Sequence, residues 1–308
     1  MIEQEVSFKS EALNLYGTLA MPDSRGPFPA VLFIAGSGQV DRNENHKKFP
    51  INLFREFASL FAGEGIASLR FDKRGVGASE GDYWSAVFSD NTTDARSALD
   101  YVRSRKEIKS GAVFLLGHSE GALIAVRLAG QGVDVAGAVL LAGAAQRGED
   151  ILRWQTRQVA AGMKGLNGLL IKLLRIDIAK AQQKQMDKIK RSTKDSYRVQ
   201  LITRLNANWM REFIDYDPTQ DLSRMKIPAL AITGSKDIQA DPSDLGKMVE
   251  LVTTDFEYHE VPNVTHILRH EEGPPTLATY KKQVNQSMDA RIPELVLNWL
   301  KKRVEVGV

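Results

Sequence analysis

The pentapeptide at positions 117–121 constrains this chain more than any other feature, because it joins a buried-strand pattern directly to a helix pattern. It reads G-H-S-E-G, follows the apolar residues 112–116 and precedes the small and apolar residues 122–128. A strand, G-x-S-x-G and then a helix is the setting in which the motif forms a nucleophile elbow, a sharp turn that lifts a serine hydroxyl clear of the backbone. We therefore predict that Ser119 is a nucleophile. The alternative is a tight turn with an incidental serine.

Short apolar runs alternate with helix patterns along most of the chain. Such alternation predicts an α/β fold with a mostly parallel central sheet and helices on both faces. We expect strands at residues 5–9, 13–20, 31–35, 66–71, 112–116, 138–142, 229–233 and 256–261. We expect helices at residues 54–64, 92–104, 122–128 and 292–303.

The stretch from 143 to about 217 interrupts this alternation. It contains several helix patterns and no good strand pattern, and some of its apolar residues recur at helical spacing, namely Leu169, Leu170, Leu173 and Leu174. We therefore expect residues 1–145 and 216–308 to form the core, with residues 146–215 inserted as a helical cap over the strand ends.

Charge is spread unevenly along the chain. Residues 151–207 carry 13 Lys and Arg against three Asp, although the net charge of the whole chain is only +3. We interpret this bias as a solvated helical face. The alternative is a surface that attracts anionic substrates or membranes.

Composition excludes several classes of protein. There is no cysteine, which rules out disulfides, thiolate catalysis and cysteine–metal sites. The acidic N-terminus lacks an apolar stretch, and no run reaches the roughly 18 apolar residues that span a bilayer. We expect a cytoplasmic protein without a signal peptide or stable membrane insertion. Nucleic-acid binding is not expected, because the basic residues lie on predicted helices without interleaved aromatic residues. The sequence leaves open whether the chain forms a homodimer.

A serine hydroxyl is a weak nucleophile that needs a general base. Among the five histidines, His266 follows the last predicted strand and therefore lies at the carboxyl edge, where α/β sheets place their chemistry. We predict that His266 is the base, with His270 as the alternative. The others fit the role less well: His118 adjoins the serine, His259 sits inside a strand, and His46 is interpreted as a surface residue.

The base in turn needs an orienting carboxylate, which should lie between the serine and the histidine in chain order. Asp237 ends the loop after the strand at 229–233 and is predicted to be this acid. The nearby Asp241 and Asp244 are interpreted as helix caps.

These residues carry a family resemblance. Ser119, Asp237 and His266, in this strand order, resemble the α/β-hydrolase fold over essentially the entire chain. Three local motifs are similar to those of bacterial carboxylesterases, including the feruloyl/cinnamoyl esterase type with an inserted cap. They are G-S-G at 36–38, R-F-D-K-R-G-V-G-A-S at 70–79 and the pentapeptide at 117–121.

The resemblance also implies an oxyanion hole, formed by the backbone N–H groups of Ser37 and Glu120, with Gly38 as the alternative to Ser37. Such esterases often have a histidine before the first glycine, whereas this chain has Ala35. We expect the segment 39–43 to supply substitute hydrogen bonds. The loop that carries Arg74, within the motif at 70–79, is interpreted as having a structural role and not a catalytic one.

The expected activity is that of a serine carboxylic-ester hydrolase that acts on a small-molecule ester through an acyl-enzyme. No metal or organic cofactor is expected. Trp209 and Phe213 are candidates for contact with the substrate, although core packing is the alternative for each. Thioesterase and peptidase activities use the same residues, and a lipase activated at membranes is a further alternative. A non-catalytic binding protein on this fold would be expected to lack a triad member, and none is missing.

Overall fold

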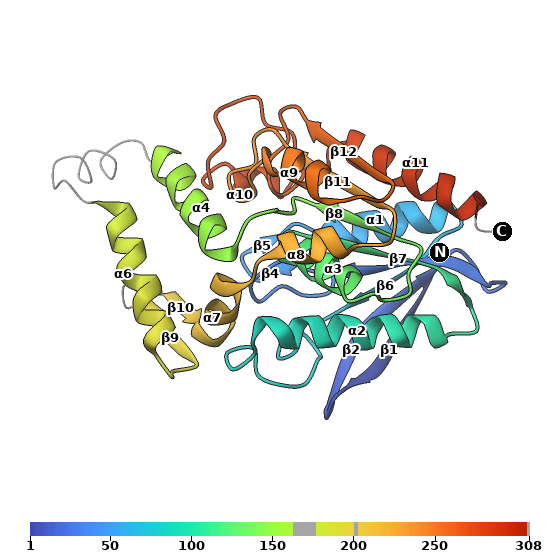
Figure 1. The fold of residues 1–308 in the computed structure, drawn as a ribbon. Helices are drawn as coiled ribbons and strands as arrows, with labels where there is room; N and C mark the ends of the chain where they lie inside the picture. Colours follow the sequence, from blue (N-terminus) through green and yellow to red (C-terminus); the bar gives the residue numbers. More distant parts are fainter. Residues whose placement is uncertain (163–176, 200–202, 307–308) are drawn as a thin grey trace.

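A single eight-stranded sheet organises the molecule, whose computed structural model describes residues 1–162, 177–199 and 203–306 (Figure 1). The strand order is β1-β2-β6-β3-β7-β8-β11-β12. β2 is antiparallel to both of its neighbours, and the other adjacent pairs are parallel, which confirms the mostly parallel sheet. The strands are β1 (Ile2–Ser10), β2 (Leu13–Met21), β3 (Phe28–Ile34), β6 (Ala67–Phe71), β7 (Ile108–His118), β8 (Gly137–Leu141), β11 (Ala229–Gly234) and β12 (Phe256–Val261).

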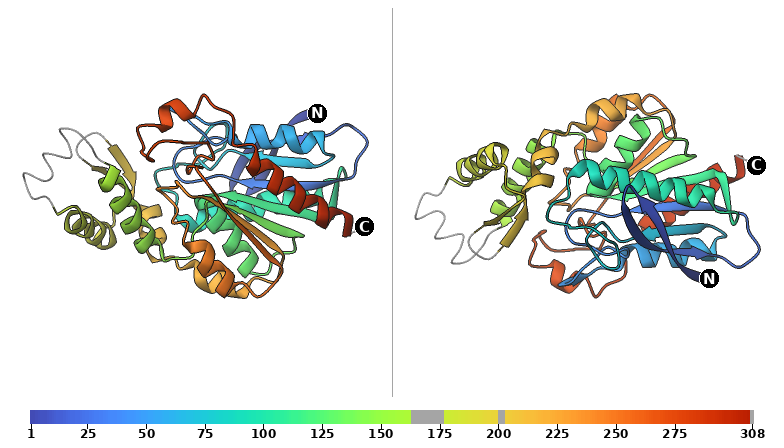
Figure 2. Two further views of the ribbon diagram at one scale, coloured as in Figure 1. Left: turned by 90° about the horizontal axis from the view of Figure 1, so that it is seen from above. Right: turned by 90° about the horizontal axis from the view of Figure 1, so that it is seen from below.

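Helices cover both faces of this sheet (Figure 2). One face carries α1 (Leu53–Gly63) and α11 (Arg291–Val306). The other carries α2 (Phe88–Ser104), α3 (Glu120–Gly130), α8 (Pro218–Arg224) and α9 (Asp244–Leu251). The central strands are buried on both faces, which explains why they are continuous apolar runs in the sequence.

Several short elements were not predicted from the sequence. They are β4 (Asn45–His46), β5 (Phe49–Pro50), α8 and α10 (Tyr280–Gln283). Elements this short contain too few residues for a periodic pattern to stand out.

The inserted segment, residues 146–215, leaves the sheet after β8 and returns before β11, so it lies beyond the carboxyl ends of the strands (Figure 1). Its described helices are α4 (Gly148–Gly162), α6 (Ile178–Arg191) and α7 (Ala207–Asp215). The expectation that this stretch contains no strand is wrong, because β9 (Ser196–Val199) and β10 (Thr203–Asn206) form an antiparallel pair. Each strand is only four residues long and gives no clear alternation. The leucine pattern at Leu169, Leu170, Leu173 and Leu174 falls outside the described residues.

A small core and a few specific contacts hold the inserted segment. Its apolar cluster consists of Met186, Ile189, Ala207 and Ile214. On α7, the ring of Phe213 packs edge-on against Phe88 of α2 at 6.1 Å, and Glu212 accepts hydrogen bonds from Ser89. α7 therefore links the inserted segment to the core.

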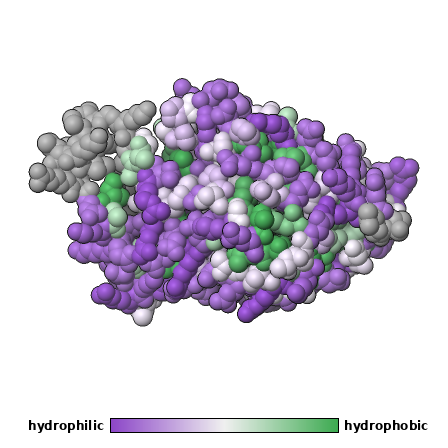
Figure 3. All heavy atoms as spheres, turned by 45° about the horizontal axis from the view of Figure 1, so that its top comes forward, coloured by the Kyte–Doolittle hydropathy of each residue, from purple (hydrophilic) through white to green (hydrophobic). Residues whose placement is uncertain are grey.

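The outer surface of the inserted segment is mostly hydrophilic on the face seen in Figure 3. Lys180, Lys184, Lys188 and Lys190 of α6 are all exposed. This exposure agrees with the interpretation of the basic bias as a solvated face.

Candidate active site

Ser119 occupies a strained turn between β7 and α3. Its backbone has φ 55° and ψ −117°, in the positive-φ range that residues other than glycine rarely adopt. The flanking glycines make this turn possible. A Cβ on Gly117 would lie 2.1 Å from the carbonyl oxygen of Gly121, and a Cβ on Gly121 would lie 1.8 Å from that of Ile34. The pentapeptide therefore forms the elbow that its sequence predicts.

We expect the Gly121→Ala substitution to destabilise the protein by about 1–3 kcal/mol or more, because the added methyl group overlaps a backbone atom of β3. Gly246 of α9 is the matched control, since a Cβ there meets no atom within 4 Å. Gly246→Ala should raise stability by about 0.5–1 kcal/mol, because alanine favours a helix over glycine. Thermal unfolding followed by circular dichroism measures both effects, and equal losses in Tm would contradict this account.

Asp237 and His266 are joined directly at the carboxyl edge of the sheet. Oδ2 of Asp237 lies 2.8 Å from Nδ1 of His266, and both side chains are buried. The other carboxylate oxygen, Oδ1, accepts hydrogen bonds from the backbone N–H groups of Gln239 and Ala240 at 2.7 and 2.8 Å. The carboxylate is therefore fixed in orientation, and it can hold the imidazole with Nε2 free to act as a base.

Ser119 and His266 line the same cavity, of about 340 Å³. No hydrogen bond joins the Ser119 hydroxyl to the His266 ring in this structure. Such contacts between a nucleophile and its base are often long without substrate and shorten in the complex. The structure thus places Ser119 and His266 on one cavity and pairs His266 with Asp237, as expected for the three predicted residues.

The other four histidines have different surroundings. His118 is buried and contacts Glu44. His259 pairs with Glu257 on β12, and the exposed His270 pairs with Glu272 at 2.6 Å. His46 is half-buried and lines the cavity beside Ser119, so its interpretation as a surface residue was incomplete. The β4–β5 turn that places His46 there has no clear sequence signal.

The predicted oxyanion donors flank Ser119. A Cβ on Gly36 would lie 3.4 Å from Cβ of Ser119, so the loop that carries Ser37 passes directly beside the serine. Glu120 is the first residue of α3, where backbone N–H groups lack a partner within the helix. Neither the Ser37 N–H nor the Glu120 N–H donates a hydrogen bond to another described residue. Both donors are therefore available to a ligand.

Glu44 orders this loop, one residue beyond the segment 39–43 from which substitute hydrogen bonds were expected. Its Oε1 accepts the N–H of Gly36 at 2.9 Å, while Nζ of Lys73 donates to the Gly36 carbonyl at 2.7 Å. Sequence reasoning missed Glu44 because its role depends on contacts with Gly36 and His118, which no local motif around position 44 indicates.

The carboxylate of Glu120 is buried beneath the elbow and has three donors. Nζ of Lys73 lies 3.1 Å away, Nδ2 of Asn91 2.7 Å and the indole nitrogen of Trp209 2.9 Å. The Trp209 ring stacks on Phe213 at 4.5 Å. These contacts give both aromatic residues packing roles, and both also line a cavity next to Ser119.

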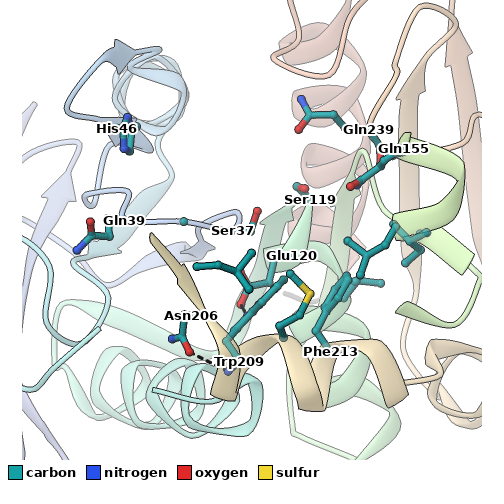
Figure 4. A pocket seen from close by; sticks show the side chains of 18 of the residues that line it. Ser37, Gln39, His46, Ser119, Glu120, Gln155, Asn206, Trp209, Phe213 and Gln239 are labelled. Atoms are coloured by element: carbon teal, nitrogen blue, oxygen red, sulfur yellow. Dashed lines mark hydrogen bonds between the residues drawn. The ribbon is translucent and has the colours of Figure 1, made fainter. Parts of the chain in front are cut away.

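Two cavities meet at Ser119. Both are lined by Ser37, His46, Ser119 and Gln239. The larger, of about 370 Å³, extends under the inserted segment towards Trp209 and Phe213 (Figure 4). The smaller lies on the His266 side and has mainly apolar walls, formed by Val40, Phe49, Ile51, Ile267, Leu277, Tyr280 and Val284.

The Arg74 loop lies outside both cavities. Arg74 is buried and donates to Asp94 at 2.7 and 2.8 Å, and it also pairs with Asp90 at 3.0 Å. These contacts tie the loop to α2 and agree with the structural role expected for it.

Two further findings concern only the described residues. No three His, Asp or Glu side chains among them are grouped so that they could hold a metal ion. None of the described helices combines the length and the apolar character needed to cross a membrane.

Comparison with known proteins gives consistent matches. Residues 50–273 match a hydrolase family described as serine aminopeptidase, S33. The chain is 25% identical over 291 residues to the esterase EstD of Thermotoga maritima, and the match covers 94% of this chain and 66% of the length of that relative.

Solved structures with the same fold have low sequence identity to this chain. Est1E from Butyrivibrio proteoclasticus with bound ferulic acid has a TM-score of 0.63 and 16% identity, covering 95% of this chain and 98% of that one. Proline iminopeptidase from Mycobacterium smegmatis has a TM-score of 0.66 and 12% identity, covering 99% of this chain and all of that one. These likenesses show the fold, which is the predicted α/β-hydrolase fold.

Proposed function

Since the chain belongs to the serine aminopeptidase, S33 family of α/β-hydrolases, we propose that it is a serine carboxylic-ester hydrolase that works through an acyl-enzyme. The observation that carries this proposal is the buried Asp237–His266 pair, which shares a cavity with a serine on a strained elbow. The similarity to the esterase EstD supports the same class of reaction.

In the proposed reaction, Oγ of Ser119 attacks the ester carbonyl carbon and its proton passes to Nε2 of His266. Asp237 stabilises the imidazolium that forms. The N–H groups of Ser37 and Glu120 bind the oxyanion of the tetrahedral intermediate. The intermediate then collapses, and the alcohol leaves with the proton from His266. A water molecule, activated by the same histidine, releases the acid and regenerates the serine.

The two cavities suit the two parts of an ester. The leaving alcohol takes its proton from His266, so it belongs in the smaller, mainly apolar cavity that His266 lines. The acyl group then belongs in the larger cavity beneath the inserted segment, next to Trp209 and Phe213. We propose on this basis that residues 146–215 act as a cap over the acyl group.

The charges that line the cavities favour an ester over a peptide with a free N-terminus. An aminopeptidase must hold a substrate ammonium group, which calls for an unpaired carboxylate close to the scissile bond. Glu44 and Glu120 are the acidic residues that line the cavities within the described part of the chain. Glu44 faces His118, and Glu120 already accepts three hydrogen bonds.

A substrate panel tests the reaction class. We expect p-nitrophenyl acetate and butyrate to be hydrolysed at kcat/KM values at least 10²-fold above those for alanine p-nitroanilide, because an ionised substrate amine would stay unpaired in the cavity. Acyl-CoA thioesters are the third class of substrate in this panel. Faster turnover of the anilide than of the esters would instead support an aminopeptidase.

A further inference from the structure

A buried pair of side chains next to the site takes no part in the proposed reaction. Oε1 of Glu44 lies 2.6 Å from Nδ1 of His118, and each side chain is only 4% exposed. Two ionisable groups buried together in this way are costly to bury unless their geometry satisfies them. The contacts of this pair therefore call for an explanation.

The protons of His118 follow from its partners. Nε2 of the ring lies 2.8 Å from the backbone carbonyl oxygen of His266. A carbonyl oxygen only accepts, so Nε2 carries a proton. Burial disfavours the charged ring, but the Glu44 carboxylate and the His266 carbonyl outweigh it and raise the pKa of His118 above its ordinary value. With Glu44 as a carboxylate, its Oε1 accepts from both the Gly36 N–H and Nδ1 of His118, so the ring donates on both sides.

Each end of the pair reaches a different part of the candidate active site. The same Oε1 of Glu44 that faces His118 also accepts the N–H of Gly36, the residue before the predicted oxyanion donor Ser37. At the other end, the His118 ring holds the His266 carbonyl and packs on the His266 ring, with centroids 4.9 Å apart at an angle of 44°.

We propose that Glu44 and His118 are positioning residues. They connect the loop that carries Gly36 and Ser37 to the loop that carries His266, and so set the distance between the oxyanion donors and the His266 imidazole. The inference rests on the proposed esterase function. A histidine in the variable position before the nucleophile of G-x-S-x-G thus has a defined role in this chain, and the partner that gives it that role is Glu44.

The chemistry of Glu44 explains why a neutral side chain cannot take its place. One carboxylate oxygen accepts from both Gly36 and His118. In a Glu44→Gln variant, an amide oxygen at this position would face an imidazolium without a counter-charge, whereas an amide nitrogen would face the Gly36 N–H, which is also a donor. The first orientation keeps both hydrogen bonds but removes the charge that stabilises the doubly protonated ring, and the second loses the hydrogen bond from Gly36.

A double-mutant cycle with Glu44→Gln and His118→Phe tests the proposal. The phenyl ring of His118→Phe keeps the packing against His266 but removes both hydrogen bonds. We expect each variant to lower kcat for p-nitrophenyl butyrate by about 10²-fold with KM changed less than about threefold, because misplaced catalytic groups affect the transition state more than binding. The double variant should be no slower than the slower single variant, because the pair acts as one connection. Binding of a trifluoromethyl ketone, which forms an oxyanion on Ser119, should weaken in parallel.

The Glu257–His259 pair on β12 provides the control. It joins the same two residue types, with His259 Nε2 2.9 Å from Glu257 Oε1, and it lines neither cavity. Glu257→Gln and His259→Phe should leave kcat unchanged. Effects of the two variants that multiply in the double variant, or an effect on KM alone, would overturn the proposal while leaving the esterase function in place. Turnover by Ser119→Ala within tenfold of the wild-type rate would instead remove the function itself. If the variants do not fold, NMR of the wild-type protein with ¹⁵N-labelled histidine replaces the cycle. A His118 ring without a proton on Nδ1 at pH 7 would then overturn the proposal.

Discussion

Replacing Ser119 with alanine is expected to lower kcat for p-nitrophenyl esters by about 10⁶-fold, the loss typical of a serine hydrolase without its nucleophile. The acyl-enzyme cannot form without the hydroxyl. The remaining oxyanion donors and the binding site can still give a slow direct attack by water, about 10³–10⁴-fold above the uncatalysed rate. The fold should not suffer, because alanine fits the same turn and Ser119 Oγ donates no hydrogen bond to a described residue.

Steady-state kinetics on purified protein measures this effect, with circular dichroism to compare the folds. Ser223→Ala on α8 is the control, since the Ser223 hydroxyl is exposed and bonds only to the backbone of its own helix. Mass spectrometry after treatment with a fluorophosphonate should find the adduct on Ser119 in the wild-type protein and none in Ser119→Ala. Turnover within tenfold of the wild-type rate would contradict the role of Ser119.

The elements that could be predicted from sequence are those encoded by local patterns. The central strands are long apolar runs because both of their faces are buried, and β12 was predicted with its observed bounds of Phe256–Val261. The elbow was predictable because two glycines and a serine at fixed spacing are needed for the close approach of Gly121 to Ile34. In both cases the signal itself is contained in a few consecutive residues, although a packing partner such as Ile34 lies elsewhere in the chain.

Contacts between distant segments could not be predicted in the same way. Glu44 reaches His118 across 74 residues, and Trp209 reaches Glu120 across 89. Neither glutamate differs in the sequence from an ordinary surface residue, because burial of a carboxylate depends on partners that only the fold supplies. The strands β9 and β10 were not predicted for a related reason. Pairing between their backbones decides their structure more than their four-residue patterns do.

Replacing Asp237 with asparagine is expected to lower kcat by about 10⁴-fold, because the amide fixes the imidazole in the wrong tautomer. The geometry around Asp237 makes this outcome specific. Oδ1 accepts two backbone N–H groups, from Gln239 and Ala240, so an asparagine must place its oxygen there. Its NH₂ group then replaces Oδ2, 2.8 Å from Nδ1 of His266. Because that group donates, it selects the ring with its proton on Nε2, which cannot accept the proton of Ser119.

Asp241→Asn is the matched control for this change. Oδ1 of Asp241 accepts from the backbone N–H and the hydroxyl of Ser243 at 3.0 and 2.8 Å, and an asparagine oxygen can accept both. We expect its kcat to stay within about twofold of the wild-type value, since a surface substitution that keeps its contacts is nearly neutral. Because Asp237→Asn blocks proton transfer and leaves the cavity walls unchanged, KM should change little while kcat falls. A larger loss in Asp241→Asn than in Asp237→Asn would show that the acid has been misassigned, since only a carboxylate bonded to Nδ1 of His266 controls its tautomer.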